Sequence, residues 1–238
     1  MQKYFNYQSK LESFRLFSVA HILTIGIIFV LGFLLFVFQK KIREKQRAFR
    51  FSLSVVLFMA ELLQHYWLIF EKAWSIKKDL PAHLSDLAVI LALLMLVTRS
   101  YKLFQFMYFA GLGSSIQAIL TPDLGEFSFP HFQYFLFFIL HGGVVLACLF
   151  MVVAFQYKPT IPSMWVTMLL INLYATIVFQ LNSAVGSNYL YIMRKPGNTS
   201  VLDYLGSWPW YLLSMDLVMI LSFYLLYCPF WVEKKMKG

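Results

Sequence analysis

Residues 17–38 read FSVAHILTIGIIFVLGFLLFVF, a run of 22 residues without Asp, Glu, Lys or Arg. As a helix rising 1.5 Å per residue it spans about 33 Å, enough for a hydrocarbon core of about 30 Å. The whole chain shares this character, because 60% of its residues are hydrophobic and 13% are charged, against about 25% charged in soluble domains. The sequence therefore predicts a polytopic integral membrane protein.

Seven apolar runs reach or approach spanning length, at 17–38, 49–70, 82–97, 101–120, 133–155, 163–183 and 208–230. Lipid cannot satisfy an open sheet edge or an irregular backbone, so we predict an all-α bundle of seven transmembrane helices that forms a single domain over residues 1–238. The third run is short, and we expect its helix to start at Pro81 with Asp79 as its cap.

The formal net charge of +9 does not indicate a nucleic-acid partner. The Lys and Arg residues lie in short loops between apolar runs, as they do at membrane flanks. Twelve of the 20 fall on the side that holds the loop between the first two runs, and eight fall on the other. Because basic loops stay in the cytoplasm, we predict a multi-pass protein of the cell membrane with its N-terminus outside and its C-terminus cytoplasmic.

Polar side chains gather on the predicted outer side. They are His21, His65, His83, His131 and His141, together with Asp123, Asn182, Asn188, Arg194 and Lys195. Two acids, Glu61 and Asp216, lie roughly 12–14 Å below the outer ends of their predicted helices, where a charge costs about 2.5–3.5 kcal/mol. Glu61 and His65 are four residues apart and can touch on one helix face. A polar cavity open to the outer side is one interpretation, and hydrogen bonding that joins the helices is the other.

The stretch Leu80-Pro-Ala-His-Leu-Ser-Asp86 brings three chemically capable side chains to the start of the third predicted helix. His83 and Asp86 are three apart and can interact, but Ser85 is turned about 200° from His83. If Ser85 is a nucleophile, its base must come from another helix, and His141 is the candidate. The alternative is a polar helix start in which Asp86 offsets the helix dipole. Counted from the predicted helix ends, Ser85 lies roughly 5 Å deep and His141 roughly 12 Å.

Five histidines on one side also raise the hypothesis of a metal site. The chain lacks His-x-x-x-His and His-Glu-x-x-His spacing, which brings two ligands to one helix face. We therefore expect neither a metal site nor a cofactor. Arg194-Lys-Pro196 can pair with a phospholipid phosphate or serve as a charged flank.

Four motifs together resemble a known family. They are Leu80-Pro-Ala-His-Leu-Ser-Asp86, Gln117-x-x-x-Thr-Pro-Asp123, Phe129-Pro-His131 and Asn188-Tyr-Leu-Tyr191. This set looks like the YwaF branch of the transmembrane-protein-164 family. The resemblance implies an integral membrane protein related to an animal acyltransferase that remodels ether-linked phosphatidylethanolamine with a cysteine. Many bacterial relatives have Cys at the position of Ser85, and a hydroxyl depends more on a nearby base than a thiol does.

The leading hypothesis is acyl transfer on a phospholipid or lysophospholipid in the predicted outer cavity. Ser85 is the nucleophile, His141 the base and His83 a further catalytic candidate. The substrate-binding candidates are Glu61, His65, Asp86, Asp123, His131, Asn182, Asn188, Arg194, Lys195 and Asp216. The expected partners are membrane lipids. The second hypothesis is a carrier or receptor that binds a ligand through Glu61, His65 and Asp216, and the third is a scaffold in which these groups only join helices.

Overall fold

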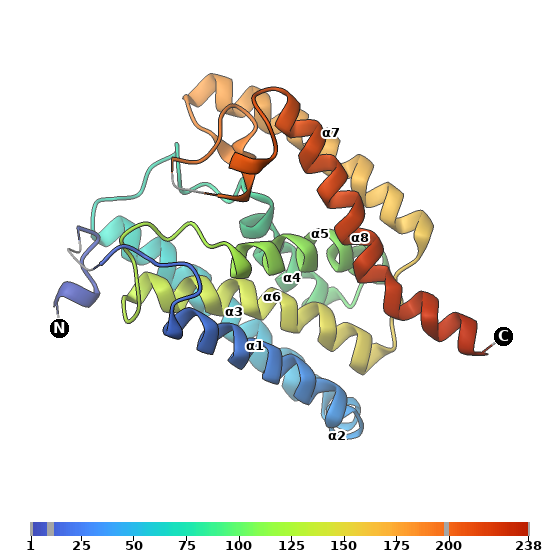
Figure 1. Cartoon of the computed structure of the whole chain (residues 1–238). Helices are drawn as coiled ribbons and strands as arrows, with labels where there is room; N and C mark the ends of the chain where they lie inside the picture. The colour runs from blue at the N-terminus through green and yellow to red at the C-terminus, as the bar shows by residue number, and fades with distance from the viewer. Residues whose placement is uncertain (1, 9–11, 198–199, 238) are drawn as a thin grey trace.

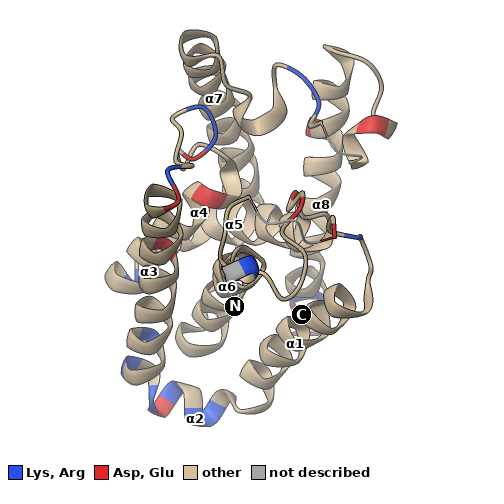
Figure 2. Ribbon diagram, turned by 90° about the vertical axis from the view of Figure 1, so that its left-hand side faces the viewer, with Lys and Arg blue, Asp and Glu red and all other residues tan. Residues whose placement is uncertain are grey.

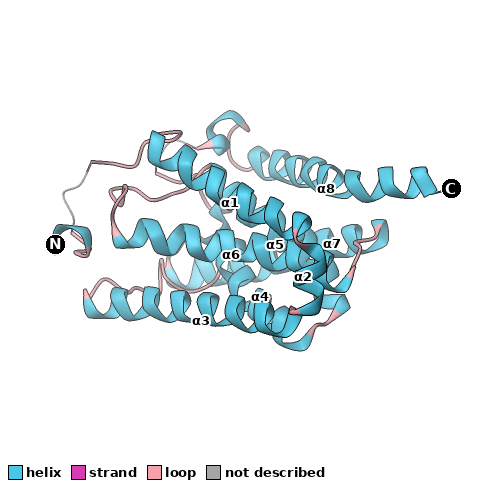
Figure 3. Cartoon of the chain, turned by 90° about the horizontal axis from the view of Figure 1, so that it is seen from below, coloured by secondary structure: helices cyan, strands magenta, loops and turns pink. Residues whose placement is uncertain are grey.

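The protein is a bundle of helices in a computed structural model that describes residues 2–8, 12–197 and 200–237. No strand occurs within these ranges (Figures 1 and 3). The described α-helices are α1 (Val19–Val37), α2 (Gln39–Glu44), α3 (Gln46–Phe70), α4 (Leu84–Thr98), α5 (Tyr101–Leu120), α6 (Phe132–Phe155), α7 (Ile161–Val185) and α8 (Trp210–Lys237). Short 3-10 helices cover Gln2–Tyr4, Tyr189–Tyr191 and Val201–Tyr204.

Each predicted apolar run overlaps one α-helix. Among the described residues, six helices are long and apolar enough to cross a bilayer, namely α1, α3, α5, α6, α7 and α8. The seventh, α4, has 15 residues, which span about 22 Å and fall short of a hydrocarbon core of about 30 Å. The predicted all-helical membrane fold is confirmed. A count of seven spanning helices and the orientation of the termini stay predictions.

Two predicted helix ends are wrong. The helix α4 begins at Leu84 rather than at Pro81, because its N-cap His83 has an extended backbone. Asp79 does not cap this helix, since its carboxylate accepts the backbone N–H of Ser75 at 2.7 Å. At the other end of the chain, α8 continues through Pro229 to Lys237 rather than ending near residue 230.

The helix α6 forms the centre of the bundle, with α1, α3, α4 and α5 packed around it (Figure 1). In its most apolar window 72% of the residues are buried, against 17% in α1 and α7 and 11% in α8. The outer helices instead expose many Leu, Ile, Val and Phe side chains. An apolar surface of this extent is typical of contact with lipid rather than with water.

Two glycines on α6 let its neighbours approach closely. A Cβ atom added at Gly143 would lie 2.5 Å from a methyl carbon of Leu57 on α3, and one added at Gly142 would lie 3.1 Å from Ile28 on α1. Leu57 is fully buried, so it has little room to move aside. Gly142 and Gly143 therefore serve helix packing, as small residues do at membrane helix contacts.

At one end of the bundle, Lys and Arg residues gather along α2 and the start of α3 (Figure 2). We call the end with the starts of α1 and α6 the histidine end, and the end with α2 the arginine end. At the arginine end Arg50 of α3 donates to the carbonyls of Leu96 and Val97 at 3.1 and 3.3 Å. The Tyr157 hydroxyl, just beyond α6, donates to the Arg99 carbonyl, just beyond α4, at 2.9 Å. The helices α4 and α6 therefore end at the same level.

Candidate functional site: a polar layer inside the bundle

The helix α4 starts far deeper in the bundle than α6 does. Both end at the same level, but α4 has 15 residues and α6 has 24. At 1.5 Å per residue the difference places Leu84 about 14 Å below Phe132, which is the depth of His141, the tenth residue of α6. The loop between α3 and α4 therefore descends into the bundle and carries His83 with it.

Tyrosines from α7 and the segment after it hold this descending loop in place. The Tyr174 hydroxyl of α7 donates to the Ala82 carbonyl at 3.0 Å. The Tyr189 hydroxyl donates to the Ile76 carbonyl at 2.7 Å and accepts the Leu80 N–H at 3.0 Å. Because the polar groups of a backbone inside a membrane protein must find partners within the protein, these two side chains make the descent possible.

His83 is the N-cap residue of α4. Its Nδ1 accepts the backbone N–H of Leu190 at 3.3 Å, which leaves the proton of the neutral ring on Nε2. The rings of Tyr189 and Tyr191 lie 5.3 and 5.1 Å from the His83 ring.

Ser85 lies on the core face of α4. It precedes Ala88, Val89 and Ala92 by three, four and seven residues, which is one helix face, and these three residues are at most 2% exposed. Its hydroxyl reaches Asp86 Oδ1 at 3.5 Å, the limit of a hydrogen bond. No bond joins Ser85 to His83, in agreement with the predicted divergence of the two side chains.

His141 is a buried imidazole with an unused nitrogen. It is 4% exposed, its Nδ1 is buried without a hydrogen-bond partner, and Phe137 packs edge-on against its ring at 4.3 Å. His141 lies near enough to His83 for their charges to interact. The structure shows no hydrogen bond between His141 and Ser85, and their predicted pairing is not tested by it.

Glu61 and His65 form the contact that their spacing predicts. His65 Nε2 lies 3.3 Å from Glu61 Oε1, and Trp74 Nε1 donates to His65 Nδ1 at 3.3 Å. Glu61 is nine residues below the end of α3, about 14 Å, and is near enough to Asp86 for their charges to interact. Four helices thus contribute to one level of the bundle. We call Glu61, His83, Ser85, Asp86, His141 and Tyr174 the polar layer.

Asn182 and Asn188 organise the chain after α7. The Asn182 amide, 1% exposed, accepts the Ser187 hydroxyl at 2.7 Å and the Tyr189 N–H at 2.8 Å, and donates to the Tyr189 carbonyl at 2.9 Å. Asn188 accepts the Arg194 N–H at 3.1 Å and donates to the Arg194 carbonyl at 2.8 Å. These bonds shape the loop that covers His83. They occupy the side-chain amides of Asn182 and Asn188, so these amides have little hydrogen-bonding capacity left for a substrate.

The charged candidates of the same loop lie nearer the histidine end. The Tyr191 hydroxyl donates to Asp123 Oδ2 at 2.9 Å, and burial together with this carboxylate raises the pKa of Tyr191. Lys195 Nζ donates to the Asp203 carbonyl at 3.4 Å. The exposed Arg194 side chain makes no hydrogen bond or ion pair with the residues that the structure describes.

Two further candidates lie apart from the polar layer. His131 caps α6, where its Nδ1 accepts the Gln133 N–H at 3.1 Å and its Nε2 donates to the Asn6 carbonyl at 3.1 Å. Burial lowers the pKa of His131, and the bond to Asn6 opposes this shift. Asp216 of α8 accepts the Asn172 amide of α7 at 3.4 Å. Within the described residues no hydrogen bond or ion pair joins Asp216 to the polar layer.

Sequence reasoning assigned no role to the three tyrosines at 174, 189 and 191. A tyrosine within a predicted membrane-spanning helix, such as Tyr174, signals a hydroxyl that needs a partner. In the ranges that the structure describes, no three His, Cys, Asp or Glu side chains are placed to hold a metal ion.

Comparison with known proteins assigns the chain to a family. The model of the TMEM164 family matches residues 16–227, which is most of the chain and includes the whole polar layer. No match was found among curated proteins or among solved structures. The chain therefore belongs to the TMEM164 family.

Proposed function

We propose that this member of the TMEM164 family is a membrane-embedded enzyme that transfers an acyl chain between phospholipid molecules. The observation that carries the proposal is the unpartnered imidazole of His141 at the depth where Ser85 presents its hydroxyl to the core. A serine nucleophile needs a nearby base, and a buried neutral imidazole is the usual one.

In the proposed reaction Ser85 Oγ attacks the ester carbonyl of a donor phospholipid while His141 takes the hydroxyl proton. The C–O bond to the glycerol breaks, the lysophospholipid leaves with that proton, and an acyl ester stays on Ser85. The hydroxyl of an acceptor lysophospholipid then attacks this ester, with His141 again moving the proton, and Ser85 is regenerated. A site about 14 Å below the helix ends is shielded from bulk water, which favours a lipid acceptor over hydrolysis.

The proposal includes an orientation and a headgroup contact. The histidine end faces outward from the cell membrane, as the twelve-to-eight distribution of Lys and Arg predicts. Arg194 is exposed and has its guanidinium available for a headgroup phosphate. Membership of the YwaF branch belongs to the same proposal, on the motifs that contain Ser85 and Asp123.

The test compares Ser85→Ala and His141→Gln with a matched control. Ser115→Ala is this control, because it removes a buried hydroxyl that has no hydrogen-bond partner and lies on α5. We expect purified wild type and Ser115→Ala to move a labelled acyl chain from phosphatidylcholine to lysophosphatidylethanolamine in vesicles. The other two variants should lose at least about 100-fold in rate, the lower end of what a general base contributes.

Covalent labelling gives a second readout. A lipid-like fluorophosphonate should modify wild-type protein and should not modify Ser85→Ala. Iodoacetamide should label Ser85→Cys more than it labels wild type, whose two native cysteines set the background. The proposed reaction would be refuted if wild type, Ser115→Ala, Ser85→Ala and His141→Gln transferred the acyl chain equally. It would also be refuted if folded wild type transferred none from any acyl donor.

A carrier or receptor is the second candidate function, and the Glu61–His65 contact of 3.3 Å favours it. It predicts that Glu61→Gln abolishes ligand-dependent activity while Ser85→Ala has no effect. Asp216 accepts a hydrogen bond from Asn172 and so joins α8 to α7. Loss of activity in Asp216→Asn would indicate a ligand site that includes Glu61, His65 and Asp216, whereas retained activity would indicate a site of Glu61 and His65 only.

A further inference from the structure

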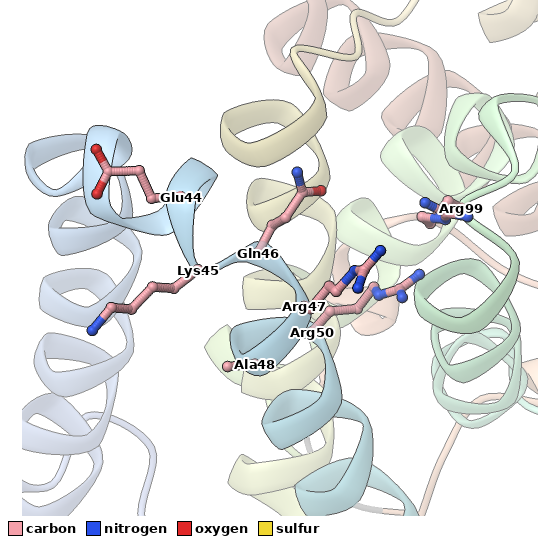
Figure 4. Close-up of a pocket in the computed structure, with 7 residues that line it drawn as sticks. All are labelled: Glu44, Lys45, Gln46, Arg47, Ala48, Arg50 and Arg99. Atoms are coloured by element: carbon pink, nitrogen blue, oxygen red, sulfur yellow. The ribbon is translucent and has the colours of Figure 1, made fainter.

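A basic depression lies at the arginine end of the bundle, opposite the polar layer. It has a volume of about 400 Å³ and is lined by residues 44–48, which run from the end of α2 into the start of α3, together with Arg50 and Arg99. Figure 4 shows Arg47 and Arg50 of α3 extending toward Arg99, which follows α4. Three guanidinium groups from two distant parts of the chain therefore converge on one hollow.

No carboxylate of the described residues neutralises this cluster. The lining includes Glu44, but its side chain points away from the arginines (Figure 4), and no ion pair joins it to them within the described ranges. Arg50 donates to the Leu96 and Val97 carbonyls, which fixes its position without removing its charge. Like charges brought together without a counter-charge repel each other, so the arrangement favours an anion between them.

The backbone holds Arg99 at this hollow in an unusual conformation. Its φ of 55° is left-handed, a conformation that favours glycine at the end of a helix. The Tyr157 hydroxyl donates a hydrogen bond of 2.9 Å to the Arg99 carbonyl and fixes the position of this backbone. A glycine would fit the backbone better but would offer no charge. The start of α3 adds the positive end of its helix dipole to the same hollow.

We infer that this depression binds the phosphate group of an anionic ligand at the membrane surface. Guanidinium groups match the geometry of phosphate oxygens, and a volume of about 400 Å³ is within the range of small-ligand sites. A glycerophosphate group meets this chemistry either as the headgroup of an acidic phospholipid or as a soluble phosphate ester. The inference does not depend on the proposed acyl transfer, because it concerns residues at the arginine end and none of the polar layer.

The experiment measures lipid retention by purified full-length protein. Nanodiscs contain equal amounts of phosphatidylcholine and phosphatidylglycerol, and native mass spectrometry counts the phosphatidylglycerol that stays bound. The test variant is Arg47→Gln with Arg99→Gln. The control is Lys40→Gln with Lys234→Gln, which removes two exposed charges at the same end but outside the hollow. Arg99→Gly is a further variant, because glycine suits a φ of 55° and cannot fail by strain.

We expect wild type and the lysine control to retain phosphatidylglycerol. The double arginine variant should lose at least about tenfold in retention and Arg99→Gly about fivefold. A second arm adds glycerol 3-phosphate to nanodiscs of phosphatidylcholine alone and records the unfolding temperature. A rise that needs Arg47 and Arg99, without phosphatidylglycerol retention, supports the same site with a soluble ligand. Equal loss in the arginine and lysine variants, or binding of neither ligand, overturns the inference.

Discussion

Replacing Asn182 with alanine tests whether this residue binds a substrate or builds the loop after α7. The substitution removes three hydrogen bonds of 2.7–2.9 Å and leaves the Tyr189 N–H, the Tyr189 carbonyl and the Ser187 hydroxyl without partners. Each buried unsatisfied group costs about 1–3 kcal/mol, and measured side-chain hydrogen bonds in membrane proteins average about 0.6 kcal/mol. We therefore expect Asn182→Ala to lower the free energy of unfolding by about 2–4 kcal/mol.

The consequence should spread to the polar layer. Tyr189 positions the chain at Ile76 and Leu80 through its hydroxyl, so a displaced Tyr189 loosens the loop that carries His83. The assay is unfolding of purified protein in detergent micelles by increasing fractions of dodecyl sulfate. Ser183→Ala is the control, because the exposed Ser183 hydroxyl bonds only to Phe179 of its own helix, and its loss should change stability by less than about 0.5 kcal/mol.

A substrate-binding role predicts a different outcome for the same pair of variants. Asn182→Ala would then unfold like Ser183→Ala and would change only the dependence of activity on substrate concentration. Equal unfolding of the two variants would refute the structural role argued here for Asn182. A large loss of stability would instead remove Asn182 from the candidate substrate contacts.

Two further predictions address packing and topology. Gly143→Ala should lower the free energy of unfolding by about 1–3 kcal/mol through overpacking, whereas Gly26→Ala, where nothing lies within 4 Å of the added carbon, should not; micelle unfolding checks both. For topology, single cysteines replace Arg194 or Lys40 in a protein without its native cysteines. In intact cells an impermeant maleimide should label the cysteine at position 194 and not the one at position 40. Labelling only at position 40 would reverse the orientation.

The helices could be predicted from sequence because hydrophobicity is a local property of the chain. The run at 101–120 matches α5 to the residue, and the Glu61–His65 contact follows from helical spacing alone. Partners across the bundle could not be predicted in this way. Asn182 and Asn188 were candidates for a substrate, since a polar side chain in a sequence shows its capacity for hydrogen bonds and not the groups that already fill it.

The depth of α4 explains why Ser85 and His141 can belong to one site. Counting from the predicted helix ends placed Ser85 roughly 7 Å above His141, because that count assumes that every helix starts at the membrane surface. In the structure α4 is nine residues shorter than α6 and ends level with it, so the assumption fails for α4. The missing length is replaced by a loop whose backbone bonds to Tyr174 and Tyr189. The helix α4 is too short to support a count of seven spanning helices. By this count of residues, its shortness is also what brings Ser85 to the level of the His141 imidazole.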